Sequence, residues 1–458
     1  MGITERLANF IVEASFDAIP KEAVTKAKSA TLDCLGVILA AVNDPIGEII
    51  IKYTKERGGT PEASVIGGDF RTSAEMAALA NGTMCHALDY DDVGLSVGHP
   101  SICIVPTALS IGEKLNSSGK EILEALIIGY EIAGKIGFGS KYVRAEKGLH
   151  TAPVFGTIGA AAVAAKLLKL DVNQVRAAFG IAASQVAGLS ANAGTMTKPL
   201  HAGTACRAGV MSALLAKEGF TGDANIIETS QGYGDSFFGK GNYDEQKMVE
   251  KLGNPFHIIS HGITVKKYPC CMLNHRALDS ILQLIEGKDI KHEQVAAIIV
   301  GVPRNISPLR PDAHTGLEGK FCLPYTMAAA LVDRKINLGT FTDEMVQRPI
   351  IREIMSKVQL QLREDVPIYN GSLSSGRAGN PITVRLKDGK TYENQVNIPR
   401  GTPEAPLTLQ ELSDKYRDCA QNVLSRKQLE RSIEMVLTLE EVKNIGELMN
   451  VVTKGPFS

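Results

Sequence analysis

The spacing of hydrophobic residues changes near residue 262, and this change constrains the fold more than any other feature of the chain. Before it, apolar positions recur at the three-to-four-residue period of an α-helix. The clearest helical candidates are residues 20–42, 122–136, 156–169, 172–186 and 203–217. Several of them are rich in Ala and Gly, and small side chains let helix axes approach closely. The sequence therefore predicts a compact core of many helices.

Strand patterns take over after residue 262. Residues 292–303 contain a β-branched run, and residues 358–363 alternate apolar and polar side chains. Residues 382–386 and 391–398 flank an Asp-Gly dipeptide at 388–389, which is typical of a tight hairpin turn. These segments predict a small sheet that includes one hairpin.

Helical spacing also occurs between the strand candidates and after them. The candidates are residues 274–285, 323–332, 407–423 and 426–449. The simplest architecture for this order is mainly α with an inserted α+β domain. We predict a large helical domain made of residues 1–262 and 403–458, and a smaller α+β lid domain of residues 263–402.

Composition and charge exclude several classes of function. Lys and Arg total 49 against 50 Asp and Glu, a formal net charge of −1, whereas a dedicated nucleic-acid binder carries a basic excess. The longest apolar runs, such as residues 34–42, fall short of the roughly 20 residues that span a bilayer. No secretory signal is visible, and the eight cysteines lack disulfide-framework spacing. We expect a cytoplasmic protein with reduced thiols and no nucleic-acid or membrane partner.

Motifs for nucleotides, zinc proteases and serine hydrolases are missing, so candidate chemistry must come from clusters of polar residues. The first cluster is HALDYDD at residues 86–92, followed by His99. On a continuous helix, His86, Asp89 and Asp92 would share one face, which would suit a metal ion. The alternative is a helix end in which the carboxylates cap the next segment and the histidine is part of the core.

Two further clusters precede helical segments. His150 lies just before the helix candidate that begins near residue 153, where a helix N-terminus disfavours a protonated histidine and attracts anions. Lys198 and His201 lie on a Gly-flanked stretch with two threonines, which suits an anion. The alternatives are a surface histidine and a solvated lysine.

The start of the second domain carries a fourth cluster. Four groups within eleven residues could together hold carboxylates, namely Lys266, Lys267, His275 and Arg276. Cys270 and Cys271 lie among them, and a reactive cysteine could use His275 as its base, whereas inert buried thiols are the alternative. Tyr325 opens an apolar helix and either packs in the core or donates its hydroxyl to a ligand.

Taken together, these clusters and the helices between them resemble the MmgE/PrpD family. The matching segments are HALDYDD (86–92), GHPS (98–101), GYEIAGKIG (129–137), HTAPVFGTIGAAAVAAKLLKLD (150–171), TKPLHAGTACRAG (197–209), KKYPCCMLNH (266–275), LPYTMAAALVD (323–333) and RGTPEAPLT (400–408). They spread over most of the chain in the order and spacing of the family. The resemblance implies a helical domain with a smaller inserted lid, usually a homodimer, that works without a metal or another cofactor.

The resemblance also implies which residues form the site. By motif position, the site residues of the family fall on Asp89, His99, His150, Lys198, Lys266 and Tyr325. We expect the two lysines to bind substrate carboxylates, with Lys267, His275 and Arg276 as further substrate ligands. His150 would be the base and His99 the acid, or the reverse. Asp89 would orient one imidazole, and Tyr325 would donate to the substrate.

Members of this family include 2-methylcitrate dehydratases, cis-aconitate decarboxylases and an iminodisuccinate epimerase. We therefore expect a lyase, in the first place a hydro-lyase of a 2-methylcitrate-like di- or tricarboxylate, as in propionate catabolism. Decarboxylation, epimerisation of a small dicarboxylate and a non-catalytic helical binding protein remain open. Val93 stands where the dehydratases and decarboxylases tend to have Thr, and Cys271 where the decarboxylases have His. Both departures remove a polar group from the expected pocket.

Overall fold

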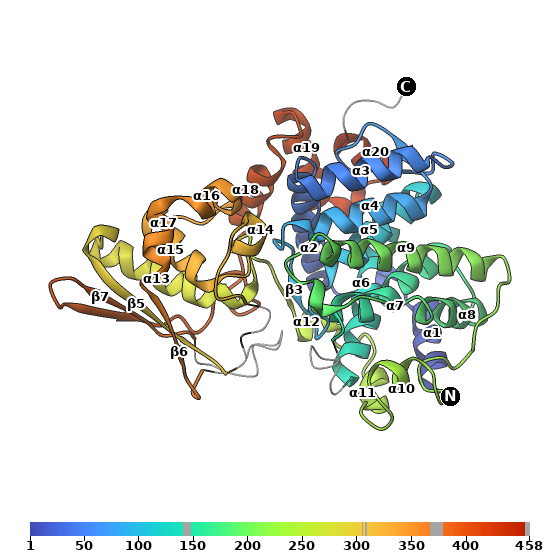
Figure 1. The fold of residues 1–458 in the computed structure, drawn as a ribbon. Helices are drawn as coiled ribbons and strands as arrows, with labels where there is room; N and C mark the ends of the chain where they lie inside the picture. The colour runs from blue at the N-terminus through green and yellow to red at the C-terminus, as the bar shows by residue number, and fades with distance from the viewer. Residues whose placement is uncertain (141–147, 305, 307–308, 367–378, 454–458) are drawn as a thin grey trace.

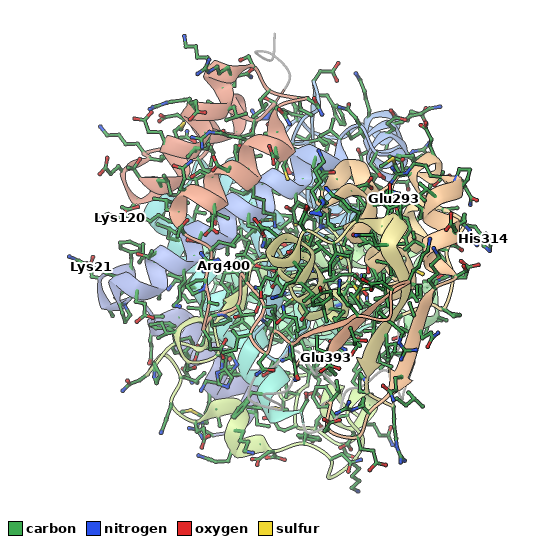
Figure 2. The ribbon with its side chains drawn as sticks, turned by 90° about the vertical axis from the view of Figure 1, so that its left-hand side faces the viewer. Lys21, Lys120, Glu293, His314, Glu393 and Arg400 are labelled. Atoms are coloured by element: carbon green, nitrogen blue, oxygen red, sulfur yellow. The ribbon has the colours of Figure 1, made fainter. Side chains whose placement is uncertain are left out.

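A computed structural model describes residues 1–140, 148–304, 306, 309–366 and 379–453. Figure 1 shows a large lobe of helices beside a smaller lobe in which helices cover a sheet. The predicted fold class, mainly α with an inserted α+β domain, is confirmed. Charged side chains such as Lys21, Glu293 and Glu393 project from the outside of the molecule (Figure 2).

Buried hydrophobic residues form two separate cores. One joins residues 3–258 to residues 412–452, and the other lies within residues 268–386. The large lobe is therefore made from both ends of the chain, and its C-terminal helices lie against α2 and α5 (Figure 1).

The large lobe packs its helices closely around α9 (Thr197–Lys217). A Cβ atom on Gly203 would lie 2.2 Å from the carbonyl oxygen of Leu79, and one on Gly209 would lie 2.5 Å from Cβ of Ala160. Small residues are thus required where α9 crosses α4 and α7, which explains the Ala- and Gly-rich sequence. The other helices of this lobe are α1 (Ile3–Glu13), α2 (Lys21–Ala41), α3 (Pro45–Arg57), α4 (Ala74–Ala87), α5 (Ser101–Leu115), α6 (Gly119–Gly139), α7 (Thr151–Leu167), α8 (Val172–Ala183), α10 (Tyr233–Phe237), α11 (Glu245–Val249), α12 (His257–Ser260), α18 (Leu409–Ala420), α19 (Arg426–Leu437) and α20 (Gly446–Val451).

Within the described ranges, no single helix is both long and apolar enough to cross a membrane. The pair α2 and α3 passes that test only when its two helices are taken together, and they meet at an angle of 88°.

The smaller lobe is a four-stranded sheet covered by helices. Its strand order is β6-β5-β7-β8, with β6 parallel to β5 and the other pairs antiparallel. In Figure 1 the helices α13, α15 and α17 lie together on one side of the sheet. The elements are α13 (His275–Lys288), β5 (Val295–Val302), α14 (Gly316–Gly319), α15 (Leu323–Asp333), α16 (Asp343–Gln347), α17 (Pro349–Met355), β6 (Val358–Leu362), β7 (Ile382–Leu386) and β8 (Thr391–Asn394).

Short strand pairs complete the large lobe and its junction with the smaller one. The pair β1 (Ala63–Ser64) and β2 (Arg71–Thr72) lies in the large lobe. The pair β3 (Val93–Gly94) and β4 (Ile263–Thr264) joins the loop after α4 to the segment that leads into the smaller lobe. This second pair places residues 86–99 next to residues 263–271.

The prediction of one continuous helix over residues 426–449 is wrong, because this segment contains two helices. Helix α19 ends at Leu437, a single 3₁₀ turn follows, and α20 begins at Gly446. Between them, the carbonyl of Val442 accepts from the amide of Gly119, and the amide of Ile445 donates to the carbonyl of Ser117. These hydrogen bonds to the start of α6 replace intrahelical ones, so tertiary contacts override the helical pattern.

Candidate active site

The candidate site forms where α4 ends. The helix stops at Ala87, and Asp89 adopts a left-handed backbone with φ of 50°. The expectation that His86, Asp89 and Asp92 share one helical face is therefore wrong, because the chain leaves the helix between them. Asp92 points back to cap the next helix, accepting from the amide and the hydroxyl of Ser101.

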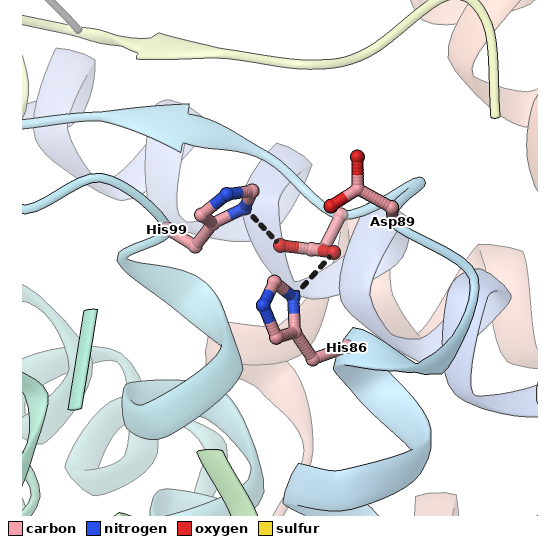
Figure 3. A group of neighbouring side chains, drawn as sticks. His86, Asp89 and His99 are labelled. Carbon is pink, nitrogen blue, oxygen red and sulfur yellow. Dashed lines mark hydrogen bonds and ion pairs between the residues drawn. The ribbon is translucent and has the colours of Figure 1, made fainter. Parts of the chain in front are cut away.

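A single carboxylate, that of Asp91, holds two imidazoles. Its Oδ1 lies 2.9 Å from Nδ1 of His86, and its Oδ2 lies 2.6 Å from Nδ1 of His99. Both contacts are the dashed lines in Figure 3, and the two ring centroids are 4.6 Å apart. Because an ionised carboxylate only accepts, both rings carry their proton on Nδ1 and present Nε2 as a free acceptor. Asp91, rather than Asp89, is thus the residue that orients the imidazoles.

Burial sets the charge states of Asp91, His86 and His99, which together form an imidazole clamp. It lowers the pKa of His86 to about 3 and also lowers the pKa of His99. Burial alone would raise the pKa of Asp91, but the two imidazoles outweigh it and hold that pKa well below its usual range. Nε2 of His86 is buried and has no hydrogen-bond partner among the described residues. The clamp therefore consists of a carboxylate and two neutral rings, each with one basic nitrogen free.

Asp89 binds two ammonium groups instead of an imidazole. Its Oδ1 lies 2.5 Å from Nζ of Lys198, and its Oδ2 lies 2.9 Å from Nζ of Lys266, which also donates to the Asp89 carbonyl at 2.7 Å. Burial disfavours every charge here, yet the nearby lysines lower the pKa of Asp89, and Asp89 raises the pKa of Lys266. The expected role of Asp89 as an imidazole holder is wrong for this reason.

His150 completes a group of imidazoles at the start of α7. Its ring stacks on that of His86 with centroids 5.5 Å apart and an interplanar angle of 15°, and its centroid is 6.4 Å from that of His99. Burial and the positive groups around it lower the pKa of His150 well below the ordinary value. Nδ1 of His150 lies 3.2 Å from Nδ1 of His201 in α9. His150 is therefore a neutral base beside the clamp.

The structure brings together five of the residues that the sequence singled out: Asp89, His99, His150, Lys198 and Lys266. His86 and His201 belong to candidate clusters of the sequence but not to the predicted site residues, and Asp91 was not singled out by the sequence. Cys271 is buried near Asp89 and Lys266, and burial raises the pKa of its thiol to about 11. A neutral thiol thus borders the lysine pair.

The remaining predicted residues make their contacts inside the smaller lobe. Nζ of Lys267 lies 3.5 Å from Asp279, and Nε2 of the buried His275 lies 3.3 Å from the carbonyl oxygen of Cys270. Arg276 lines a cavity together with Met272, Val302 and Leu323. The hydroxyl of Tyr325 donates to the carbonyl of Thr340, and the ring packs in the core. The hydroxyl of Tyr325 is thus engaged within the core, and substrate contacts of Lys267, His275 and Arg276 stay a prediction.

The same cluster contains four ligand atoms that lie close enough together to surround a cation. One ligand atom from each of His86, Asp89, Asp91 and His99 lies within 4.8 Å of the others. However, both oxygens of Asp91 accept from imidazoles, and both oxygens of Asp89 face ammonium groups. A divalent cation would have to displace two positive charges, so the residues do not fit a metal site. They fit a small anion that lies between lysines and neutral imidazoles.

Comparison with known proteins finds matches over most of the chain. The MmgE/PrpD N-terminal domain matches residues 5–246, and the MmgE/PrpD C-terminal domain matches residues 268–441. A cis-aconitate decarboxylase of Mus musculus is 28% identical over 467 residues, which cover 99% of this chain and 94% of the relative. A cis-aconitate decarboxylase of Aspergillus terreus is 26% identical, covering 100% and 97%. A 2-methylcitrate dehydratase-like protein of Aspergillus oryzae is 24% identical, covering 96% and 93%.

Proposed function

Because the chain belongs to the MmgE/PrpD family, we propose that it is a lyase that eliminates water from a small hydroxy di- or tricarboxylate. The observation that carries the proposal is the meeting of two lysines with three imidazoles around the end of α4. Such an elimination needs a proton acceptor, a proton donor and cations to stabilise the charge that develops next to a carboxylate.

Lys198 and Lys266 are the proposed carboxylate ligands. Each ammonium has three donors, and Asp89 uses only part of them, so a substrate carboxylate can share both lysines with Asp89. Each charge-assisted hydrogen bond contributes about 1.5–3 kcal/mol net. Asp89 in this scheme keeps the two ammonium groups apart and in place before the substrate arrives.

His150 is the proposed base and His99 the proposed acid. A substrate with two or three negative charges raises the pKa of a neighbouring imidazole, so binding favours a proton on Nε2 of His99 while Asp91 keeps the proton on Nδ1. His150 then takes the proton from carbon, and His99 protonates the departing hydroxide. The segment at residues 266–271 connects the lysine and thiol side of the site to the smaller lobe, which we propose closes over the substrate.

Decarboxylation is the second candidate, and the relatives named as cis-aconitate decarboxylases favour it. It needs one proton donor for the new carbanion and no departing hydroxide. Cys271 argues against decarboxylation, because the decarboxylases of this family resemble one another in having a histidine at that position. The same lysines and imidazoles serve both reactions, and the substrate decides between them.

The test offers the purified protein a panel of hydroxy polycarboxylates and cis-aconitate. Ultraviolet absorbance detects a new C=C bond, and a CO2 assay detects decarboxylation. Dehydration predicts absorbance without CO2, whereas CO2 from cis-aconitate would replace the first proposal by the second. Solvent deuterium entering the substrate without net product would indicate epimerisation. If none of these occurs, and Lys198→Ala and His150→Ala leave polycarboxylate affinity unaltered, the site is not catalytic.

A further inference from the structure

His201 contacts His150 through the ring nitrogen Nδ1 of each residue. The two Nδ1 atoms are 3.2 Å apart, and the ring centroids are 5.4 Å apart. At this distance one nitrogen donates and the other accepts, so the two rings hold one shared proton. His201 is partly exposed and lies one turn after Lys198 on α9. The contact therefore joins the imidazole group to a second, partly exposed histidine on α9.

The backbone around Gly188 is shaped to hold this pair. The carbonyl of Gly188 accepts from the amide of His150 at 3.0 Å, and a Cβ atom on Gly188 would lie 3.1 Å from Nδ1 of His201. Gly188 has φ of 134°, a conformation that other residues rarely adopt. The next hydrogen bond, from the amide of Ser190 to the carbonyl of Gly148, ties the same two segments together. One small residue thus positions both rings.

We propose that His201 is a proton relay that connects His150 with solvent. This inference rests on the proposed function of His150 as the base. When substrate covers Nε2 of His150, the opposite ring nitrogen is the exit for a proton. Nε2 of His150 takes the proton from the substrate carbon, Nδ1 of His150 passes its own proton to Nδ1 of His201, and Nε2 of His201 releases a proton to water. After the product has left, Nε2 of His150 gives its proton to water, Nδ1 of His201 returns its proton to Nδ1 of His150, and Nε2 of His201 takes a proton from water. These steps reset both rings, and no electrons are exchanged between them.

The experiment compares His201→Ala with His314→Ala on the substrate that the wild-type protein converts. His314 is an exposed histidine of the smaller lobe and serves as the matched control (Figure 2). We expect His201→Ala to lower kcat by about 10²-fold with little change in KM, because proton transfer is slowed while the carboxylate ligands remain. Added imidazole should restore part of kcat in His201→Ala only. An unchanged kcat would overturn the relay. A lower kcat together with a higher KM, without rescue by imidazole, would also overturn it.

A second measurement needs no turnover and separates this inference from the proposed function. In ¹⁵N-histidine NMR spectra of the ligand-free protein, His150 should carry its proton on Nδ1 and His201 should carry its proton on Nε2. A proton on Nδ1 of His201 instead would leave Nε2 of His150 protonated and unable to accept, and would refute the relay. His201→Gln should shift the signals of His150, whereas His314→Ala should leave them unchanged. If both Nδ1 atoms lack a proton, the rings share none and the relay is refuted, even if the protein proves to be a lyase.

Discussion

Replacing Asp91 by Asn tests whether one carboxylate holds two imidazoles. The carboxylate accepts from Nδ1 of His86 at 2.9 Å and from Nδ1 of His99 at 2.6 Å. A carboxamide has one acceptor oxygen and one NH2 group, so one ring must move its proton to Nε2 and lose its free basic nitrogen. At least one charge-assisted hydrogen bond is lost, at about 1.5–3 kcal/mol.

We therefore expect Asp91→Asn to lower the free energy of unfolding by about 1.5–3 kcal/mol and kcat by about 10²–10⁴-fold. Urea denaturation and steady-state kinetics at pH 7 measure the two effects. The neighbouring Asp92→Asn is the control, because burial raises the pKa of Asp92 to about 8 and its carboxyl is mostly protonated at pH 7. Asn resembles that neutral acid, so activity should stay close to wild type. Equal activity losses in both variants, or an active Asp91→Asn, would refute the clamp.

Four further predictions concern stability and binding. Lys266→Met should lower the free energy of unfolding by about 3 kcal/mol, since it leaves the buried Asp89 with one lysine; adding Asp89→Asn should recover part of this loss in urea denaturation. Gly203→Ala should cost about 1–3 kcal/mol, whereas Gly287→Ala, which has open space around it, should stabilise α13 by about 0.5–1 kcal/mol. The raised pKa of Asp92 means that folding retains a proton which the unfolded chain releases above about pH 4. The contribution of Asp92 to the free energy of unfolding of the wild type therefore decreases as the pH rises from about 4 to about 8. Urea denaturation should show that Asp92→Asn becomes more stable relative to wild type over that range. Finally, calorimetric titration with a polycarboxylate in buffers of different ionisation enthalpy should show uptake of up to about one proton, and the absence of buffer dependence would contradict proton loading of the imidazoles.

Local patterns predicted the elements whose residues determine their own conformation. The alternation in residues 358–363 and the Asp-Gly hairpin correspond to β6 and to β7 with β8, and the apolar run from residue 323 corresponds to α15. In contrast, which carboxylate of residues 89–92 meets which partner depends on where α4 ends. The left-handed backbone of Asp89 takes the chain out of the helix, so the side chains that follow no longer obey helical spacing. Spacing alone could not select Asp91.

The position of that helix end depends on contacts from distant parts of the chain. Lys266 donates to the carbonyl of Asp89 at 2.7 Å, Lys320 to that of Leu88 at 2.8 Å, and Lys415 to that of Tyr90 at 2.9 Å. These carbonyls have left the helix and would otherwise be buried without partners. The three lysines come from the segment after β4, the smaller lobe and α18, so both lobes and both ends of the chain fix one short loop. A buried ammonium supplies a donor that reaches such a loop from far away in sequence, and one of the three, Lys266, also contacts the carboxylate of Asp89 in the candidate site. The conformation of this loop thus depends on donors from three distant segments, which is why the sequence pattern of any one segment reveals so little about the site.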